Sequence, residues 1–247
     1  MLQEQNSYAG VTNKLLAAKA KKICVAYDGM ERFFPYDRIV KTGNPVRKDL
    51  LERKGDAAKS RALFGLDSEK PTVLVVGGSL GALTLNETLE RDIKKLVDQG
   101  LQVIWQTGKN FGTRGEEASR NLKGVVVTQF ITDMGAAYSA ATLVVSRAGA
   151  GAISELELLG KPVILVPSPN VAEDHQRKNA LALSTRGAAV MVPDSEARNK
   201  LSDEIIGLAT DEKRLADMSE RIKEMACPES DELIVDEIEK ILGSMGK

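Results

Sequence analysis

The chain has 247 residues, which is enough for one or two domains with a buried core. Its 34 Lys and Arg residues balance 35 Asp and Glu residues, so the net charge is −1, and aromatic residues make up 4%. This composition excludes the basic, aromatic-rich surface of a nucleic-acid-binding protein, while two cysteines and one histidine exclude a disulfide framework and a site of several histidines.

The sequence pattern of residues 1–47 predicts only part of a domain. A helix is expected at residues 10–21 and a strand at residues 23–26, followed by a loop that ends in Thr-Gly-Asn-Pro, a run of turn formers. Because one strand cannot make a sheet, we interpret residues 1–47 as the remnant of an N-terminal domain. The charged residues 48–70 are expected to form an interdomain connection of one helix and a loop.

Residues 71–226 show a regular alternation of strands and helices. Short apolar runs predict six strands, at residues 72–76, 101–105, 125–128, 143–145, 163–166 and 188–192. Helical segments separate most of these runs, and this alternation is typical of a parallel, doubly wound sheet. The predicted fold class is therefore α/β, with one complete Rossmann-like domain at 71–226 and a C-terminal helix at 227–247.

A glycine-rich turn, Gly77-Gly78-Ser79-Leu80-Gly81, joins the first strand of this domain to the next helix. Glycines let the backbone approach a ligand closely, and a helix N-terminus favours phosphate. Gly78, Ser79 and Gly81 are therefore candidate phosphate-binding residues, and the alternative is a tight turn without a ligand. No lysine follows as in a Walker loop, and no acid ends the second strand as a nicotinamide site requires.

Three further loops follow other strands of the same sheet. The loop after the fourth strand is rich in small residues, and Glu155 beyond it can accept hydrogen bonds from ribose or merely complement the helix dipole. His175, Gln176 and Asn179 are suited to sugar hydroxyls, whereas Asp133, after the third strand, can simply begin a helix. The carboxyl ends of parallel strands share one edge, where ligands of open α/β sheets bind.

Together and in this order, these motifs make the chain resemble the MurG family of bacterial glycosyltransferases. Members transfer N-acetylglucosamine from UDP-N-acetylglucosamine to lipid I, which yields lipid II for peptidoglycan and thereby supports cell-wall biogenesis, cell shape and cell division. The resemblance spans residues 3–226 and rests on Glu4-Gln5-Asn6, Gly10-Val11-Thr12-Asn13, Thr42-Gly43-Asn44-Pro45-Val46-Arg47, Gly77-Gly78-Ser79-Leu80-Gly81-Ala82, Ile104-Trp105-Gln106-Thr107-Gly108, Ser154-Glu155 and Asp174-His175-Gln176 with Asn179-Ala180.

The resemblance implies the GT-B fold of two Rossmann-like domains and an inverting transfer that needs no metal or other cofactor. It also implies a set of UDP-N-acetylglucosamine-binding residues. These are Asn6 on the sugar side, Arg47 at the diphosphate, Ser79 at a phosphate, Ile131 with its backbone at uracil, Ala150, Gly151, Ala152, Ile153, Ser154 and Glu155 around the diphosphate and ribose, and Gln176 at the sugar hydroxyls, with Gly78, Gly81 and His175 as further candidates.

The implied partners are UDP-N-acetylglucosamine, lipid I and the inner face of the cytoplasmic membrane, bound peripherally, with no nucleic acid. Family members begin with a full Rossmann-like domain that carries a Gly-Gly-Thr-Gly-Gly-His loop, which this sequence lacks. We therefore expect an N-terminally truncated member whose catalytic base lies in the missing region, and which binds the donor without transferring the sugar. The alternatives are a non-catalytic UDP-sugar-binding subunit of a split GT-B glycosyltransferase and a UDP-sugar epimerase of the same fold.

Overall fold

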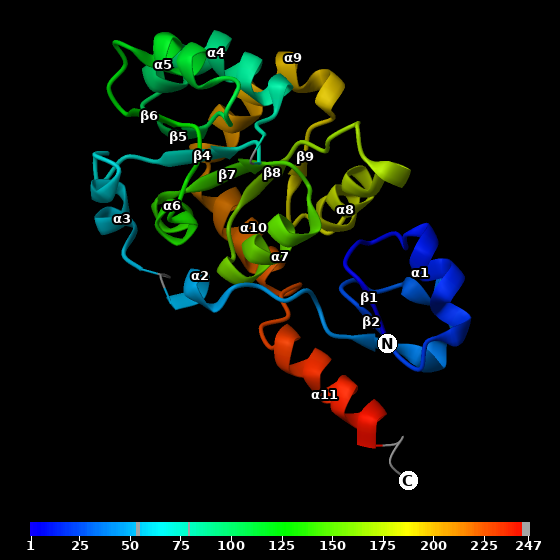
Figure 1. The fold of residues 1–247 in the computed structure, drawn as a ribbon. Coiled ribbons are helices and arrows are strands. Elements are labelled where there is room, and N and C mark those ends of the chain that lie inside the picture. Colours follow the sequence, from blue (N-terminus) through cyan, green and yellow to red (C-terminus); the bar gives the residue numbers. More distant parts are fainter. Residues whose placement is uncertain (53–54, 79, 244–247) are drawn as a thin grey trace.

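The structure, a computed structural model, describes residues 1–52, 55–78 and 80–243. Its described strands form two separate sheets, one of three strands and one of six. The small sheet lies at the opposite end of the molecule from the edge strand β6 (Val125–Thr128) of the large sheet (Figure 1). Helix α8 (His175–Ser184) lies next to the small sheet.

The large sheet confirms the predicted parallel, doubly wound arrangement. Its strands follow the order β6-β5-β4-β7-β8-β9, and every neighbouring pair is parallel. Most of their residues are buried because helices cover both faces, which explains the continuous apolar runs in the sequence. The remaining strands are β4 (Thr72–Val76), β5 (Gln102–Gln106), β7 (Leu143–Ser146), β8 (Val163–Leu165) and β9 (Val190–Met191).

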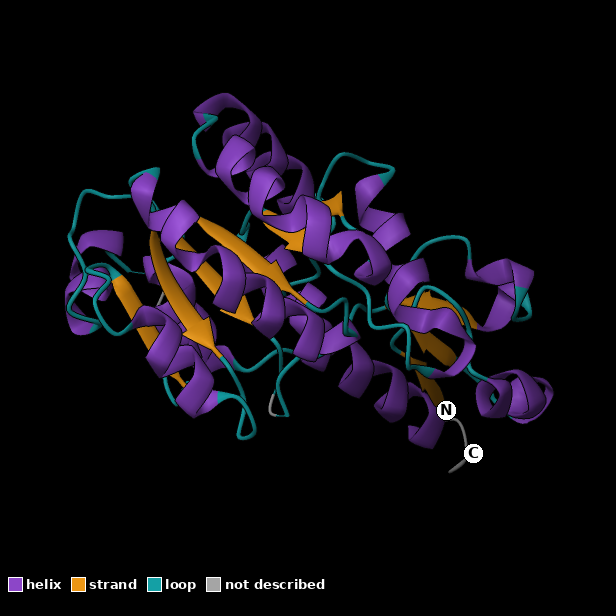
Figure 2. Ribbon diagram, turned by 90° about the horizontal axis from the view of Figure 1, so that it is seen from above, coloured by secondary structure: helices purple, strands orange, loops and turns teal. Residues whose placement is uncertain are grey.

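Alternate side chains of these strands enter two different hydrophobic clusters. Val73, Val75 and Trp105 pack with residues of α4 (Leu83–Asp98) and α9 (Asp194–Ala209), next to α5 (Gly112–Ser119). The opposite face packs with α6 (Met134–Ala140), α7 (Ala150–Leu159) and α8, while α10 (Glu212–Lys223) contributes to both clusters. Figure 2 shows the large sheet between these helical layers.

The small sheet corrects the prediction for the first 47 residues. Three strands, β1 (Leu2–Glu4), β2 (Ile23–Val25) and β3 (Ile39–Lys41), pair in parallel in this order, although the sequence pattern indicated only one strand. A strand of three residues is too short to show a reliable period. The helix predicted at 10–21 is α1 (Val11–Leu16) followed by a 3₁₀ turn (Ala17–Lys19).

Residues 48–70 contain two short helices instead of the one predicted. These are α2 (Lys48–Glu52) and α3 (Ala57–Leu63), and Asp56 caps α3 by accepting hydrogen bonds from the backbone N–H groups of residues 58 and 59. Arg61 donates from Nε to the Ala140 carbonyl at 3.1 Å and from Nη2 to Thr142 Oγ1 at 3.1 Å. These contacts fasten α3 to the large sheet's helical layer, so this connection is not a free linker.

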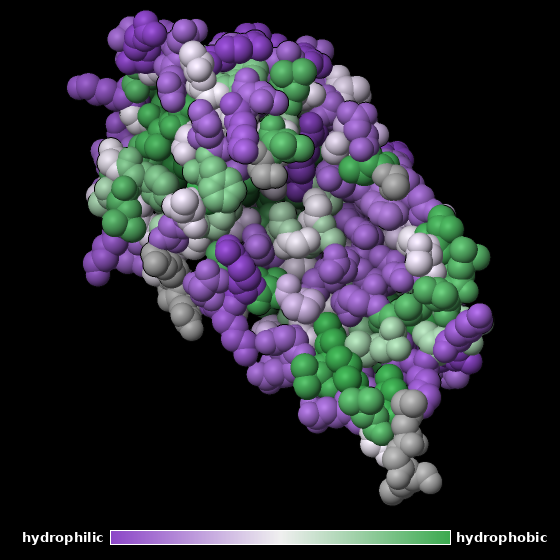
Figure 3. Space-filling model, viewed as in Figure 1, coloured by the Kyte–Doolittle hydropathy of each residue, from purple (hydrophilic) through white to green (hydrophobic). Residues whose placement is uncertain are grey.

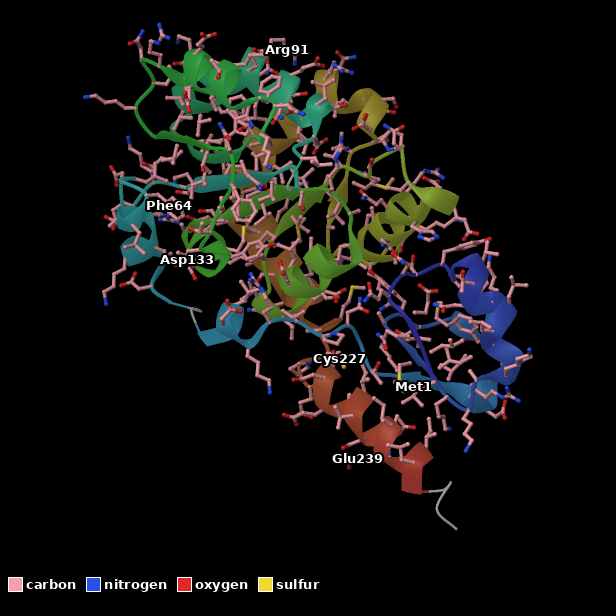
Figure 4. All side chains as sticks on the ribbon, viewed as in Figure 1. Met1, Phe64, Arg91, Asp133, Cys227 and Glu239 are labelled. Carbon is pink, nitrogen blue, oxygen red and sulfur yellow. The ribbon has the colours of Figure 1, made fainter. Side chains whose placement is uncertain are left out.

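Helix α11 (Ser230–Gly243) returns to the small sheet and lies beside it. The Cys227 thiol donates to the Thr42 carbonyl at 3.0 Å, and a Cβ atom at Gly43, whose φ is +73°, would lie only 2.4 Å from Cys227 Cβ. Figure 4 labels Cys227 near the start of α11. The glycine therefore allows the segment after β3 and the segment before α11 to touch.

Apolar side chains gather on the surface over α1 and α11 (Figure 3). The exposed ones include Val11, Leu15 and Leu16 on or next to α1, and Val235 and Leu242 on α11. Among the described helices, none combines the length and apolar character required to cross a bilayer.

Candidate donor-binding site

The predicted loops meet at the carboxyl edge of the large sheet. Strand β4 lies between β5 and β7, so the chain leaves β4 toward one side of the sheet and later returns to its other side. Such a reversal in strand order creates a crevice at the carboxyl ends, where α/β folds bind ligands. The turn after β4 and the start of α7, after β7, flank this crevice.

The glycines after β4 have different roles. Gly78 has a φ of +83° and open space around its Cβ position, whereas a Cβ atom at Gly81 would lie 2.1 Å from the Thr107 carbonyl oxygen. Asn86, in α4, donates to that same carbonyl at 2.8 Å and holds the two loops together. Packing therefore accounts for Gly81, and Gly78 keeps its backbone open to a ligand. Ser79 lies outside the described residues.

The N-terminus of α7 is open to a ligand. Gly149 is its N-cap residue, with extended backbone, and no side chain caps the helix. Apart from their neighbours in the chain, none of the described residues has an atom within 4 Å of the Cβ positions of Gly149 and Gly151, and Ala150 and Ala152 are half-buried. Free N–H groups and the helix dipole make this terminus suitable for a diphosphate.

The next two residues of α7 point inward. Ile153 is fully buried in the core, and Ser154 Oγ accepts a hydrogen bond from Asn44 Nδ2 at 3.1 Å. Asn44 Nδ2 also donates to the Gln5 carbonyl at 3.1 Å. The side chains of Ile153 and Ser154 therefore hold the helix and the small sheet in place, and only their backbone atoms remain as candidates for ligand contact.

Glu155 is half-buried and accepts a hydrogen bond from the Tyr138 hydroxyl at 2.9 Å. Burial raises the pKa of Glu155, while the Tyr138 bond and the positive charge of Arg47 oppose that rise. Arg47 is exposed, and its Nε lies 3.8 Å from Asp49 Oδ1. The charge of Arg47 therefore acts on the Glu155 carboxyl group. Sequence reasoning missed Tyr138, whose only signal is a lone aromatic residue in an alanine-rich helix.

The loop after β6 places Ile131 at the same edge. The Ile131 side chain is buried in the core, whereas the neighbouring Phe130 is exposed. Asp133 caps α6 by accepting from the Ala136 N–H at 3.0 Å, which confirms the interpretation that it begins a helix (Figure 4). The buried Ile131 side chain anchors its backbone in the loop at the carboxyl end of β6.

Gln176 links two loops of the crevice. Its Oε1 accepts hydrogen bonds from the Ala148 N–H at 3.2 Å and the Ser168 N–H at 2.8 Å. The described residues provide no acceptor for its Nε2, which is therefore the group that can meet a sugar hydroxyl. His175, next in the chain, pairs through Nε2 with Glu173 Oε2 at 3.2 Å.

Asn179 does not occupy the position suggested by its sequence neighbourhood. It is fully buried, and its Oδ1 accepts from the Ser7 N–H at 2.9 Å. Its Nδ2 donates to Asn6 Oδ1 at 3.0 Å and to the Ala148 carbonyl at 3.3 Å. Asn179 therefore joins the small sheet to the large one and is not available to a sugar. A pattern of polar residues cannot reveal such a distant partner.

Asn6 lies in a cleft of about 510 Å³ between the start of α1 and the segment before α8. The cleft also contains Glu4, Asn13, Glu173 and His175. The buried Glu4 carboxylate accepts from the Asn6 backbone N–H at 3.0 Å and from Asn13 Nδ2 at 2.9 Å. Asn6 and His175, predicted separately from distant motifs, are therefore brought together.

Comparison with known proteins agrees with this geometry. The model of the glycosyltransferase family 28 C-terminal domain matches residues 72–234. A protein of Parabacteroides distasonis named UDP-N-acetylglucosamine–N-acetylmuramyl-(pentapeptide) pyrophosphoryl-undecaprenol N-acetylglucosamine transferase is 55% identical over 244 residues. The match covers 98% of this chain and 66% of that protein. A Porphyromonas gingivalis protein of the same name is 54% identical, with 98% and 65% covered.

Solved structures give the same picture. The crystal structure of Acinetobacter baumannii MurG aligns with a TM-score of 0.77 and 30% identity, covering 97% of this chain and 66% of that one. The resemblance to the MurG family is thus confirmed. A UDP-N-acetylglucosamine 2-epimerase aligns at a TM-score of 0.58 with 16% identity, which shows a shared fold alone. The chain spans slightly less than two thirds of the length of these curated relatives.

Proposed function

Since the chain belongs to the family of glycosyltransferase family 28 C-terminal domains, we propose that it binds the sugar donor in the synthesis of lipid II. In this reaction N-acetylglucosamine passes from UDP-N-acetylglucosamine to lipid I. The observation that carries the proposal is the meeting of Arg47, Glu155 and the uncapped N-terminus of α7 at one sheet edge. The names of the relatives support the same donor and acceptor.

Each part of the donor has a matching group. The backbone N–H groups of Ala150, Gly151 and Ala152, together with Arg47, would hold the diphosphate. Glu155 would accept hydrogen bonds from the ribose hydroxyls. Four further residues complete the donor site: Ile131 with its backbone at uracil, and Gln176 and Asn6 at the sugar, with His175 beside them.

The reaction proposed for the complete enzyme is a direct displacement at the anomeric carbon. The acceptor hydroxyl attacks as UDP leaves, and the configuration inverts. Negative charge grows on the diphosphate during this step, so the N–H groups of α7 and the Arg47 guanidinium would stabilise the transition state more than the ground state. These groups supply leaving-group stabilisation, and the family activity requires a general base in addition.

In this proposal residues 71–226 form the donor-binding domain, and Asn6 and Arg47 contribute to the donor site from residues 1–47. Residues 1–47 would be part of an acceptor domain, residues 48–70 would connect the two, and residues 227–247 would form the C-terminal helix. The second candidate function is a non-catalytic UDP-sugar-binding subunit that works with a separate acceptor-binding chain. The same donor site supports this function. Transfer of the sugar that occurs only after a separate acceptor-binding chain is added would favour the subunit function.

We place the reaction at the cytoplasmic face of the bacterial membrane, with the protein bound peripherally. The acceptor named for the relatives is attached to undecaprenol, a membrane lipid. The exposed Leu15 and Leu16 near Lys14 and the exposed Lys19 and Lys21 support this placement, because apolar and basic residues together favour an anionic lipid surface.

Calorimetric titration tests the proposal. UDP-N-acetylglucosamine and UDP-glucose are titrated into the purified chain, with ADP and NAD as controls. We expect that only the uridine nucleotides bind. The α7 terminus would bind the diphosphate of any of these nucleotides, whereas the Ile131 backbone would pair with uracil and not with adenine. A folded sample that binds none of the four, or binds ADP equally well, would contradict the donor-site proposal.

A further inference from the structure

A second cavity lies between the small sheet and the layer formed by α7 and α8. Its volume is about 550 Å³, within the range of small-molecule sites. None of the described candidate donor-site residues lines it. The residues that characterise its wall are Ser7 after β1, Tyr27 after β2, Lys41 in β3, Glu157 in α7, and Thr185 and Arg186 after α8.

Two buried hydroxyl groups at this cavity have no partner. They belong to Ser7 and Tyr27, whose oxygens find no hydrogen-bond partner in the described part of the chain. Glu157, on the same wall, is 9% exposed, and its carboxyl group lies near the charges of Lys41 and Arg186. Unsatisfied buried polar groups are costly, and native proteins keep few of them. Their concentration around one cavity points to a polar ligand.

The cavity has a cationic lining. Four of its residues carry positive charge: Arg32, Lys41, Lys178 and Arg186. Asp28 lies between two of them, with Oδ1 2.7 Å from Lys41 Nζ and Oδ2 3.5 Å from Arg186 Nη2. The acids of the lining are Asp28, Glu157 and Glu224. Cations outnumber ionised acids at neutral pH, so the lining favours an anion.

Glu157 strengthens this preference. Burial raises its pKa to about 8, against the opposing charges of Lys41 and Arg186. Burial also raises the pKa of the neighbouring Tyr27. At neutral pH the Glu157 carboxyl is therefore mostly protonated and can donate a hydrogen bond to a ligand, as a hydroxyl does.

We propose that this cavity binds a small organic anion that carries hydroxyl groups, of the sugar phosphate class, at a site separate from the donor site. The anionic group would lie among Lys41, Arg186 and the other cations. The hydroxyl groups would meet the protonated Glu157 and the hydroxyls of Tyr27 and Ser7. This inference does not depend on the proposed function, because the two sites share no residue.

The test uses glucose 6-phosphate as the probe, titrated calorimetrically into the full chain in the presence of saturating UDP. Glucose and inorganic phosphate are titrated in parallel. We expect one molecule of glucose 6-phosphate to bind per chain, more tightly than either comparison molecule. The proposal is overturned if the probe does not bind, if UDP abolishes its binding, or if glucose or phosphate binds equally well.

Variants then locate the bound probe. Lys41→Met should weaken binding about tenfold, since a hydrogen bond to a charged group is lost. Lys94→Met, which removes an exposed lysine of α4 elsewhere on the molecule, is the matched control and should change nothing. Equal affinity of the Lys41→Met variant and the unchanged chain, both folded by circular dichroism, would contradict the assignment.

The pH dependence gives a second, independent readout. Ionisation of Glu157 above about pH 8 places a negative charge against the anion, so affinity should fall about tenfold between pH 7 and 9. The charge of glucose 6-phosphate is nearly constant between pH 7 and 9, because the second pKa of a phosphate ester is about 6. Glu157→Gln stays neutral and should remove this dependence. An unchanged pH profile in that variant would overturn the role of Glu157.

Discussion

Glu155 is the single side chain on which the donor site depends most. Replacement by alanine should weaken UDP affinity by about 1–3 kcal/mol, because hydrogen bonds between the ribose and a charged acceptor are lost. Calorimetry measures this change directly, and Glu117→Ala, an exposed glutamate of α5, is the control. An unchanged affinity in the Glu155→Ala variant would leave Glu155 with the lesser role of complementing the helix dipole.

A second prediction concerns the pH dependence of UDP binding, which we expect Tyr138 to influence through Glu155. Its hydroxyl lowers the pKa of Glu155, so Tyr138→Phe should allow that pKa to rise further. Because the ribose needs the ionised carboxylate as acceptor, affinity declines as pH falls through this pKa. The decline should begin at a higher pH in the Tyr138→Phe variant than in the unchanged chain. Coincident pH profiles would show that the bond does not tune Glu155.

At the scale of elements, the sequence was sufficient for the large sheet and insufficient for the small one. Strands buried on both faces leave continuous apolar runs, such as residues 72–76, that are visible without any partner. Strands β1 and β3 have three residues each and are stabilised by pairing with β2, which periodicity cannot detect. The same holds for the candidate site. The Gly-rich loops could be predicted because they are local sequence signals, whereas the roles of Tyr138 and Asn179 depend on contacts with residues far away in the sequence.

The side chain of Asn179 links α8 to the segment after β1, and this contact can be tested by mutation. Asn179→Ala leaves the buried N–H of Ser7 and carbonyl of Ala148 without their partner, which should cost about 2–4 kcal/mol in the free energy of unfolding. Urea denaturation measures this cost. Asn13→Ala is the matched control, because its bonds to Gln3 and Glu4 stay within the small sheet and its environment.

The two asparagine variants should also differ in hydrogen exchange. Asn179→Ala removes a link between the sheets, so the amides of β1–β3 should exchange faster while those of β4 and β7 remain protected. Asn13→Ala should leave the large sheet unaffected and disturb mainly the start of α1. Equal exchange of the small sheet in the unchanged chain and the Asn179→Ala variant would contradict a linking role.

At the scale of the whole molecule, α7 connects three regions. Glu155 faces Tyr138 and Arg47 at the donor site, Ser154 bonds Asn44 beside the small sheet, and Glu157 lines the second cavity. Residues two apart in a helix point to nearly opposite sides. One helix therefore contributes residues to both proposed ligand sites and to the contact between the sheets. A shift of α7 would change the geometry of all three.

The last prediction concerns what the whole chain does with a bound donor. Direct displacement requires a group that takes the proton of the acceptor hydroxyl. Among the candidate site residues, Glu155 is assigned to ribose and bonded to Tyr138, and His175 is assigned to the sugar of the donor. We therefore expect that the chain binds UDP-N-acetylglucosamine and forms no lipid II from lipid I, measured with a radiolabelled donor and chromatography of the lipid fraction.

A catalytically complete relative serves as the positive control for this assay, and His175→Ala identifies the source of any activity. Lipid II formed by the unchanged chain and lost in the His175→Ala variant would contradict the prediction and make His175 the base, with Glu173 orienting its ring. Donor binding without transfer would instead show that leaving-group stabilisation at Arg47 and α7 is separable from proton abstraction.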